Sequence, residues 1–252
     1  DQCCSRLQHL SIKSQYLIPL LPNFKSNFPA IKTLEIRWSY SDNLDSHLKT
    51  IISSKTLKCL QIIYSKNKKK SALNIEGELV SPIEELKLED VYWHFVSDFL
   101  KVERFPCLKK LHIVIHTKYL NLEDVLKTLS SFPQLTSLTL EGFFLLPNEE
   151  LSFRFENLKF FHLDVLQETL YLDHLLSCMP NLVELQLKGE NIKELKLQDT
   201  IDIRYVELTC DFFKNNGDYI NVIKNTPNLI QLTTKKYENF PIQSIPFAPE
   251  LA

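Results

Sequence analysis

Glycine is scarce in this sequence, with four residues among 252. Loops that cradle phosphate groups need several glycines, because the backbone must approach the ligand without a Cβ in the way. The stretch GENIKELK at 189–196 has one glycine and is no such loop, and no Gly-x-Ser-x-Gly sequence marks a serine nucleophile. The sequence therefore lacks the motifs of nucleotide-binding enzymes and serine hydrolases.

Long apolar runs and a strong charge are also missing. No segment approaches the roughly 20 apolar residues that a membrane-spanning helix needs, so no membrane partner is expected. The formal net charge is −2, which argues against a nucleic-acid partner. No secretory leader is visible, and Asp1 in place of Met leads us to expect a preceding segment.

The six cysteines show no pairing pattern of the kind found in secreted repeat proteins. Cys3 and Cys4 stand beside each other near His9, and adjacent cysteines without a fourth ligand make a poor zinc site. No Asn-x-Ser/Thr glycosylation acceptor occurs. We therefore expect an intracellular protein, in the cytoplasm or nucleus, with no metal and no cofactor.

A hexapeptide with apolar residues at its first, fourth and sixth positions recurs along the chain. LTSLTL at 135–140 is one copy, and the others begin at Leu7, Ile31, Leu57, Ile83, Leu108, Leu158, Leu182, Ile192, Ile203 and Leu229. Most successive starts are 23 to 27 residues apart, and only Thr234 breaks the apolar pattern. A period near 25 is typical of leucine-rich repeats, whose units are roughly 20–29 residues long.

The spacing of these apolar residues has a physical reason. In an extended segment the fourth and sixth side chains point the same way, into a core, and the first enters that core from the preceding turn. Segments stacked side by side form a parallel sheet, and each return path must cover its inner face. We predict that one such sheet contains strands near 9–13, 33–37, 59–63, 85–89, 110–114, 137–141, 160–164, 184–188, 194–198, 205–209 and 231–234.

The segments between the motifs have helical periodicity. NLEDVLKTL at 121–129 carries apolar residues at i, i+3, i+4 and i+7 behind Asn121, a good N-cap. Similar patterns occupy 41–52, where Ser41 and Leu44 begin the pattern, 92–100 and 171–179. Proline cannot continue a helix, and it precedes several motifs by two residues. These prolines are Pro29, Pro106, Pro133, Pro180 and Pro227.

The runs FPQLTSLTL, MPNLVELQL and TPNLIQL resemble the leucine-rich repeats of the ribonuclease-inhibitor-like superfamily, and within it the substrate-receptor half of F-box proteins. The resemblance covers roughly residues 5–235. It implies an α/β leucine-rich-repeat solenoid, a horseshoe with a parallel concave β-sheet and helices on the convex side. We expect a domain over 1–235 with about ten irregular repeats of 23–27 residues, shortened at 182–208, and a proline-containing tail or cap over 236–252.

Three departures from the family pattern are expected to make the fold uneven. The Asn or Cys that usually follows the hexapeptide by three residues is absent, so the turns after the strands should be irregular. Within 182–208 two motifs follow their predecessors after 10 and 11 residues, which leaves room only for short turns. Residues 66–80 have no helical period and carry Lys66 and Lys68–Lys70; they form either a solvated loop or a patch for an acidic partner.

Two residue pairs have the composition of an acid–base site, His162 with Asp164 and Asp173 with His174. The first pair would project from one strand about 7 Å apart, and the second lies on a predicted helix. Neither meets the geometry that catalysis requires. No catalytic residue is predicted, and we expect the protein not to be an enzyme.

The exposed face of the predicted sheet, where the third, fifth and seventh motif positions project, is the expected binding surface. Small residues such as Ser137 and Thr139 lie between aromatic and cationic ones, and interfaces concentrate such anchors. The residues predicted to bind a partner are Arg37, Lys110, His112, Phe160, His162 and Tyr205. The alternative is that a loop of this chain, or a segment outside this sequence, covers Phe160.

These observations favour a protein-binding module. The resemblance implies the substrate-recognition repeats of an F-box-like ubiquitin-ligase receptor, with a protein partner on the concave face and a ubiquitin-ligase adaptor bound through a segment before Asp1. The alternative is an interaction or sensor module of a non-ligase multidomain protein. Because a terminal repeat exposes its apolar face, we also expect residues before Asp1 to cover Leu7, Leu10 and Ile12.

Overall fold

The structure, a computed structural model, describes residues 4–38, 45–64, 79–116, 120–145, 151–165, 169–189, 194–197, 201–210, 223–235 and 243–246. The chain divides into two compact units, the first within 1–117 and the second within 118–252. Both are mixed α/β with mostly parallel strands, as the sequence predicts. The lysine-bearing segment 66–78 and most of the tail 236–252 lie outside the described residues.

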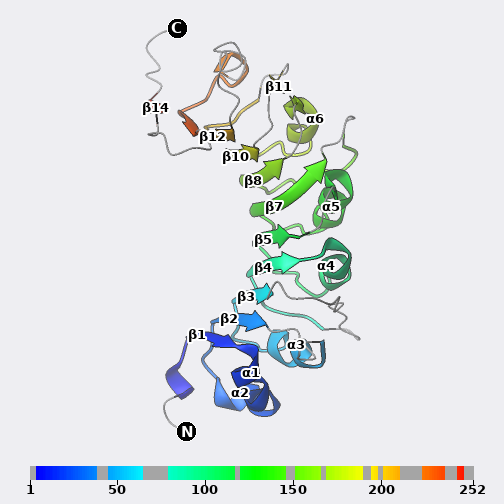
Figure 1. Cartoon of the computed structure of the whole chain (residues 1–252), viewed down its shortest axis with the longest axis vertical. Coiled ribbons are helices and arrows are strands. Elements are labelled where there is room, and N and C mark those ends of the chain that lie inside the picture. The colour runs from blue at the N-terminus through cyan, green and yellow to red at the C-terminus, as the bar shows by residue number, and fades with distance from the viewer. Residues whose placement is uncertain are drawn as a thin grey trace. The chain divides into compact units, whose positions relative to one another are not determined.

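Parallel strands in chain order form the sheet of the first unit (Figure 1). They are β1 (His9–Lys13), β2 (Thr33–Trp38), β3 (Cys59–Tyr64), β4 (Glu85–Val91) and β5 (Lys110–Ile115). The register aligns equal motif positions, so that Leu34 lies opposite Leu10 on one side and Leu60 on the other. In β2 to β5 the first, fourth and sixth motif side chains are at most 2 % exposed. The predicted inner face is therefore the core.

Helices cover one side of this sheet, as Figure 1 shows for α3 and α4. The helical segments of the unit are η1 (Cys4–Arg6), α1 (Ser14–Leu17), η2 (Ile18–Asn23), α2 (Phe24–Asn27), α3 (Asp45–Ile52) and α4 (Trp93–Phe99). α3 buries Leu48, Ile51 and Ile52, and α4 buries Val96 and Phe99. These apolar positions are those of the predicted helical patterns, whereas Ser41 and Leu44 lie outside the described residues.

A buried arginine closes the end of α4. Arg104 donates from Nη1 to the carbonyl oxygens of Phe99 at 2.7 Å and Asp98 at 3.3 Å. Its guanidinium carbon also lies 5.8 Å from the centre of the Phe99 ring. A cation is favourable at a helix C-terminus, where carbonyl groups lack helical partners. Arg104 therefore replaces the hydrogen bonds that α4 loses where it ends.

The second unit has the same design. Its parallel strands are β7 (Ser137–Leu145), β8 (Phe160–Val165), β10 (Glu184–Gly189), β12 (Tyr205–Cys210) and β13 (Gln231–Lys235), in that order. The short β6 (Leu120–Asn121) pairs with the end of β7, and β14 (Gln243–Pro246) pairs antiparallel with β13. The helices are α5 (Leu122–Leu129) and α6 (Leu172–Leu176). Asn121 caps α5 as predicted, because its Oδ1 accepts the Glu123 N–H at 3.0 Å.

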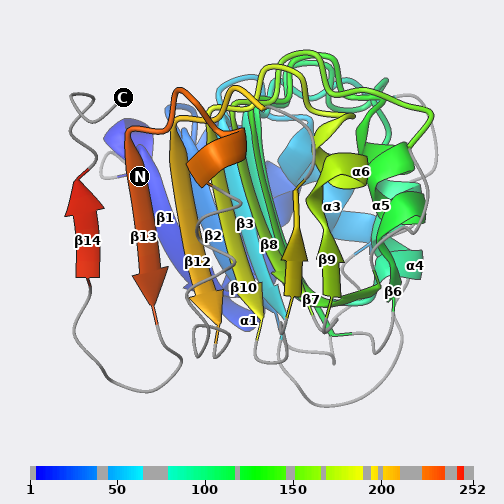
Figure 2. The ribbon, with the colours of Figure 1, turned by 90° about the horizontal axis from the view of Figure 1, so that it is seen from above.

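One predicted strand does not join the main sheet. β11 (Glu194–Lys196) pairs with β9 (Thr169–Tyr171) in a separate two-stranded sheet, and β10 pairs directly with β12. Figure 2 shows this small sheet on the side of the helices. Thr169 lies opposite Glu194, one period of about 25 residues later. The hexapeptide at Ile192 thus continues the return path after β10, as β9 does after β8. The predicted strand at 194–198 is confirmed over 194–196, but its predicted place in the main sheet is wrong.

The turns before five of the strands are built in the same way. The N–H of the first motif residue donates to the carbonyl three residues earlier, as from Leu135 to Phe132 at 3.2 Å and from Leu182 to Met179 at 3.1 Å. The same bond precedes Ile31, Leu108 and Leu229. The proline that we predicted as the end of each helix is thus the second residue of a β-turn, where its fixed φ is favourable.

A polar ladder joins neighbouring turns, and sequence reasoning did not find it. The Asn157 side chain donates to the Pro133 carbonyl at 2.8 Å, and the Asn181 side chain donates to the Glu156 carbonyl at 2.8 Å. The Thr136 carbonyl accepts two backbone N–H groups of the following motif. The family pattern places an Asn or Cys after each strand. In this chain Asn157 and Asn181 instead join the turns before β8 and β10.

Two strands are irregular near their C-terminal ends, whereas the expectation of irregular turns after the strands stays a prediction. The register of β4 with β5 shifts between Leu88 and Val91, where Asp90 has a φ of 59°. The register of β7 with β8 shifts between Leu140 and Phe144, where Gly142 has a φ of 150°. Bulges of this kind re-aim the chain where the ladder is interrupted.

The first strand differs from its neighbours in burial. Leu10 and Ile12 of β1 are half-buried, whereas Leu34 and Ile36 at the same positions of β2 are fully buried. The expectation that preceding residues cover this apolar edge stays a prediction. Within the described part of the chain, no helix has the length and apolarity that crossing a membrane requires.

Candidate functional site

The third, fifth and seventh motif residues project from each sheet on the side opposite the buried leucines, and we call this side the polar face. In the first unit most of the charged side chains of this face are paired with a charge of opposite sign. Three ion pairs join its side chains: Arg37 with Glu35 at 3.2 Å, Lys87 with Glu89 at 2.8 Å and Lys110 with Glu85 at 3.8 Å. Gln61 on β3 also donates to Glu89 on β4 at 2.9 Å. The face is therefore a network of matched partners.

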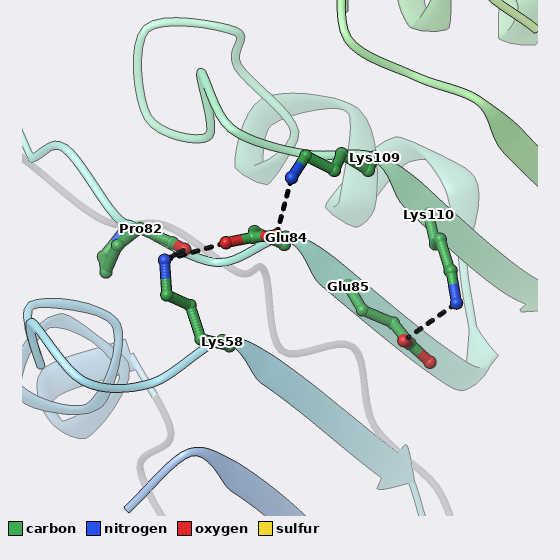
Figure 3. Close-up of polar contacts among 6 residues, drawn as sticks. All are labelled: Lys58, Pro82, Glu84, Glu85, Lys109 and Lys110. Atoms are coloured by element: carbon green, nitrogen blue, oxygen red, sulfur yellow. Dashed lines mark hydrogen bonds and ion pairs between the residues drawn. The ribbon is translucent and has the colours of Figure 1, made fainter.

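The second motif residues form another cluster, at the strand starts (Figure 3). Glu84 accepts from Lys58 at 2.8 Å and from Lys109 at 2.8 Å, and Lys58 also reaches the Pro82 carbonyl at 3.5 Å. The hydrogen bonds from Lys109 and Lys58 lower the pKa of Glu84 to about 2. This clasp links three successive motifs, so we assign it to the cohesion of the first unit.

His162 organises the polar face of the second unit. Its Nδ1 lies 3.1 Å from Gln186 Oε1 on β10, and its Nε2 lies 3.2 Å from Asp164 Oδ1 on its own strand. Asp164 Oδ2 accepts from Lys188 at 3.2 Å. Gln186 Nε2 donates to Glu184 at 2.9 Å, which fixes the direction of the amide. The ring is thus clamped between two oxygen atoms.

This geometry favours the protonated ring. Burial lowers the pKa of His162, but the hydrogen bonds to Asp164 and Gln186 and the charges of Asp164 and Glu141 outweigh it, so the pKa lies above its ordinary value of 6.5. Two acceptor oxygens can both be satisfied only when both ring nitrogens carry hydrogen. Because both nitrogens are engaged, the ring is positioned to hold charge rather than to transfer a proton.

A hollow lies over β10, β12 and β13, beside this network. Its volume is about 280 Å³, and it is lined by Glu184, Tyr205, Val206, Glu207, Gln231 and Thr233. Tyr205 lies directly between Glu184 and Gln231 in the register, and its side chain is 38 % exposed. The hollow therefore combines two carboxylates with an accessible aromatic ring.

The structure brings together some of the predicted site residues. Phe160 and His162 lie on β8, and Tyr205 lies on β12 with only β10 between them. Phe160 is half-buried beside Glu184, and its predicted role as a binding residue stays a prediction. These three residues form one surface of the second unit.

The other predicted residues belong to the first unit. Arg37 on β2 is exposed and paired with Glu35, and two strands separate it from Lys110 and His112 on β5. The predicted grouping of Lys110 and His112 with Phe160 spans the two units and stays a prediction. Glu194 and Lys196, which were expected on the polar face, lie in the small sheet instead.

Sequence reasoning missed the residues that hold His162. It treated His162 and Asp164 as about 7 Å apart along the strand, but the side chains turn toward each other and their atoms lie 3.2 Å apart. Gln186 was visible as the fifth residue of the next motif. Only the parallel register, in which Gln186 lies opposite His162, shows that it completes the clamp.

In the described ranges no cluster of three or more His, Cys, Asp or Glu side chains could hold a metal ion. The buried Cys178 thiol donates to the Leu175 carbonyl at 3.0 Å, and burial raises its pKa to about 12. Cys178 is therefore a packing residue.

No protein-family model matches the chain, and no curated protein sequence matches it.

Proposed function

We propose that the chain is a non-enzymatic, protein-binding module of the leucine-rich-repeat solenoid type, whose partner lies on the polar face. The observation that carries the proposal is the difference between the two sides of strands β2–β5, β7, β8, β10 and β12. One side buries the motif leucines against the core, and the other carries half-exposed aromatic and polar side chains such as Phe160 and Tyr205. Aromatic anchors beside small residues supply much of the free energy of protein association.

The finer proposal is that these strands are the substrate-recognition repeats of an F-box-like ubiquitin-ligase receptor. It is supported by the runs FPQLTSLTL, MPNLVELQL and TPNLIQL. Their prolines occupy the turns before β7, β10 and β13. The competing proposal is an interaction or sensor module of a multidomain protein that is not a ligase.

Site-directed photo-crosslinking tests the first proposal. A benzoylphenylalanine replaces Gln231 on the polar face, or Lys127 on the exposed side of α5 as the matched control. With the photoreactive residue at position 231 we expect a crosslink to one partner protein, and an excess of chain without the photoreactive residue should abolish this crosslink by competing for the partner. With the photoreactive residue at position 127 we expect no crosslinked protein. Equal crosslinking from both positions, or crosslinking only from 127, would contradict the proposal.

Copurification in the natural host tests the ligase assignment. The protein is expressed at its natural length with an affinity tag, and the eluate is probed for the ubiquitin-ligase adaptor. We expect stoichiometric adaptor that survives Phe160→Ala, because the adaptor binds outside the polar face. A crosslinked partner with no adaptor would favour the non-ligase module.

A further inference from the structure

Positive charge is concentrated at the start of the chain. Residues 1–70 contain 12 Lys and Arg against 4 Asp and Glu, whereas residues 71–252 contain 17 Lys and Arg against 27 Asp and Glu. The two segments therefore carry +8 and −10, which the overall net charge of −2 conceals. Among the described side chains of 4–64, Glu35 is the one carboxylate, and it already pairs with Arg37. The first strands of the first unit thus lie in a basic region.

Backbone hydrogen bonds place some of these cations in a row along the edge where the strands begin. The Lys32 N–H donates to the Gln8 carbonyl at 2.8 Å, and the Lys58 N–H donates to the Lys32 carbonyl at 2.8 Å. The same bonds continue the row through Glu84 and Lys109. Neighbouring strands lie about 4.8 Å apart. Lys32 and Lys58 are therefore adjacent like charges.

The row is neutralised unequally along its length. Glu84 lies between Lys58 and Lys109 and binds both ammonium groups (Figure 3). Lys32 has the uncharged Gln8 on its other side, and its exposed ammonium group makes no ion pair with a described residue. Like charges side by side on neighbouring strands are destabilising. The charge of Lys32 is therefore available to an anion from outside the chain.

Two further cations stand near this edge. Arg6 belongs to η1, directly before the first motif, and Lys55 lies between the end of α3 and the start of β3. Both side chains are exposed, and neither makes an ion pair within the ranges that the structure describes. The edge therefore carries unpaired positive charge beside each of its first three strands.

A hollow of about 430 Å³ adjoins this edge on the side of the helices. It is lined by residues 22–26, which lead into β2, by residues of α3 and the turn after it, which lead into β3, and by Leu79. Lys25 and Lys49 line it, and its described lining contains no carboxylate. Lys49 has another interaction, whereas exposed Lys25 makes no ion pair with a described residue. We call Arg6, Lys25, Lys32 and Lys55 the basic edge.

The surroundings of the basic edge select among anionic partners. A long nucleic acid would also meet the remainder of the chain, whose net charge of −10 repels it. Proteins that hold single strands add aromatic rings on which bases stack. The one aromatic ring that lines the hollow is Phe24, which is 1 % exposed. A short acidic peptide segment needs no stacking and fits the length of three strands.

We propose that the basic edge binds a short acidic segment of a partner protein, whose Asp and Glu side chains pair with Arg6, Lys25, Lys32 and Lys55. Single exposed ion pairs are weak, so the segment must meet several of these cations at once. This contact goes beyond the proposed function, which places a partner on the polar face, because it adds a second surface where the strands begin.

A defined peptide tests the assignment. The ¹⁵N-labelled chain is titrated with acetyl-hexaglutamate-amide at low salt, and backbone amide shifts are followed by NMR. We expect saturable shifts at 6–8, 25–26, 32–33 and 53–56, and none with the hexaglutamine peptide. Because the contact is electrostatic, added salt should weaken the binding. Absence of shifts at these positions would overturn the proposal.

Variants distinguish a located site from general attraction. Lys32→Gln/Lys55→Gln should weaken hexaglutamate binding at least fivefold, because two of the pairing charges are lost. Lys13→Gln/Lys127→Gln removes the same charge from exposed positions at the end of β1 and on α5, and it should leave binding unchanged. Equal weakening in the two variants would show that net charge alone attracts the peptide and would overturn the proposal.

A competing polyanion tests the choice of partner. Heptathymidylate carries six phosphate charges, as many as the carboxylates of hexaglutamate, and we expect it to bind no more tightly than the peptide. Tighter binding of the oligonucleotide would overturn the assignment to an acidic protein segment. If hexaglutamate binds the basic edge while crosslinks come only from the α5 side, the proposed function is wrong and this inference stands.

Discussion

Two cations show how single residues are held in this protein. His162 is clamped on the polar face by Asp164 and Gln186, and Arg104 is buried at the end of α4. In each case acceptor oxygens face the donor nitrogens. Removing either cation leaves its acceptor oxygens without donors. The free energy of unfolding then falls both because the hydrogen bonds are lost and because the acceptors stay desolvated without a partner. The two sites differ in their pKa shifts, because the pKa of His162 is raised in spite of its burial, whereas burial lowers the pKa of Arg104.

His162→Gln should make stability less dependent on pH. Since the folded pKa lies above the unfolded value of 6.5, the stabilisation is complete below pH 6.5 and is lost as pH rises through the folded pKa. The groups that surround the His162 ring or its partner Asp164, and so set its pKa, are Asp164, Gln186, Lys188 and Glu141. Urea unfolding at several pH values should show a wild-type advantage that shrinks as pH rises. His9→Gln, at an exposed position of β1, is the control. If the free energies of unfolding of the wild type and of His162→Gln differ by the same amount at every pH, the clamp on a protonated His162 is contradicted.

Arg104→Met should lower the free energy of unfolding by about 2 kcal/mol or more, because each hydrogen bond to a charged group contributes about 1.5–3 kcal/mol. Methionine keeps most of the volume but cannot satisfy the carbonyls of Asp98 and Phe99. Arg154→Met, at an exposed position, is the control and should change the free energy of unfolding by less than about 0.5 kcal/mol. Equal effects of the two substitutions in urea unfolding would show that Arg104 does not cap α4.

At the scale of elements, the hexapeptide predicts most strands because its spacing reports directly which side chains are buried. The helix over 122–129 was predictable for the same reason, together with its Asn121 cap. The strand at 194–196 was misplaced, because apolar residues in a return path can satisfy the same pattern. The Asn157 and Asn181 ladder was missed because its bonds join residues about one period apart.

The clasp around Glu84 gives a prediction at this scale. A ¹³C NMR titration of its side-chain carboxyl should give a pKa of about 2. Lys58→Ala and Lys109→Ala should each raise it, and the double variant should approach the ordinary 4.5. The stabilisation is present above pH 4.5 and lost as pH falls toward 2, and it is small because solvent screens exposed ion pairs. If the pKa of Glu84 is the same in both lysine variants as in the wild type, Lys58 and Lys109 do not hold this carboxylate.

At the scale of the whole molecule, the sequence locates the polar face better than it locates the residues that meet on it. Alternation along each strand shows which side chains project, so Phe160, His162 and Tyr205 could be named in advance. Whether they meet depends on the strand order, and removal of 194–196 from the sheet is what leaves one strand between β8 and β12. The hollow beside Tyr205 could not be predicted, because it is formed by side chains of three strands at once.

The affinity of Phe160→Ala for the crosslinked partner tests the central claim most directly. Calorimetric titration should show binding weaker by about 2 kcal/mol or more, as for a central anchor. The free energy of unfolding should change by less than about 1 kcal/mol, because Phe160 is half-exposed and its cross-strand contacts are modest. Tyr16→Ala, which removes a ring that is 61 % exposed on α1, should leave both unchanged. A large loss of stability with unchanged binding would show instead that Phe160 belongs to the core and that the partner lies elsewhere.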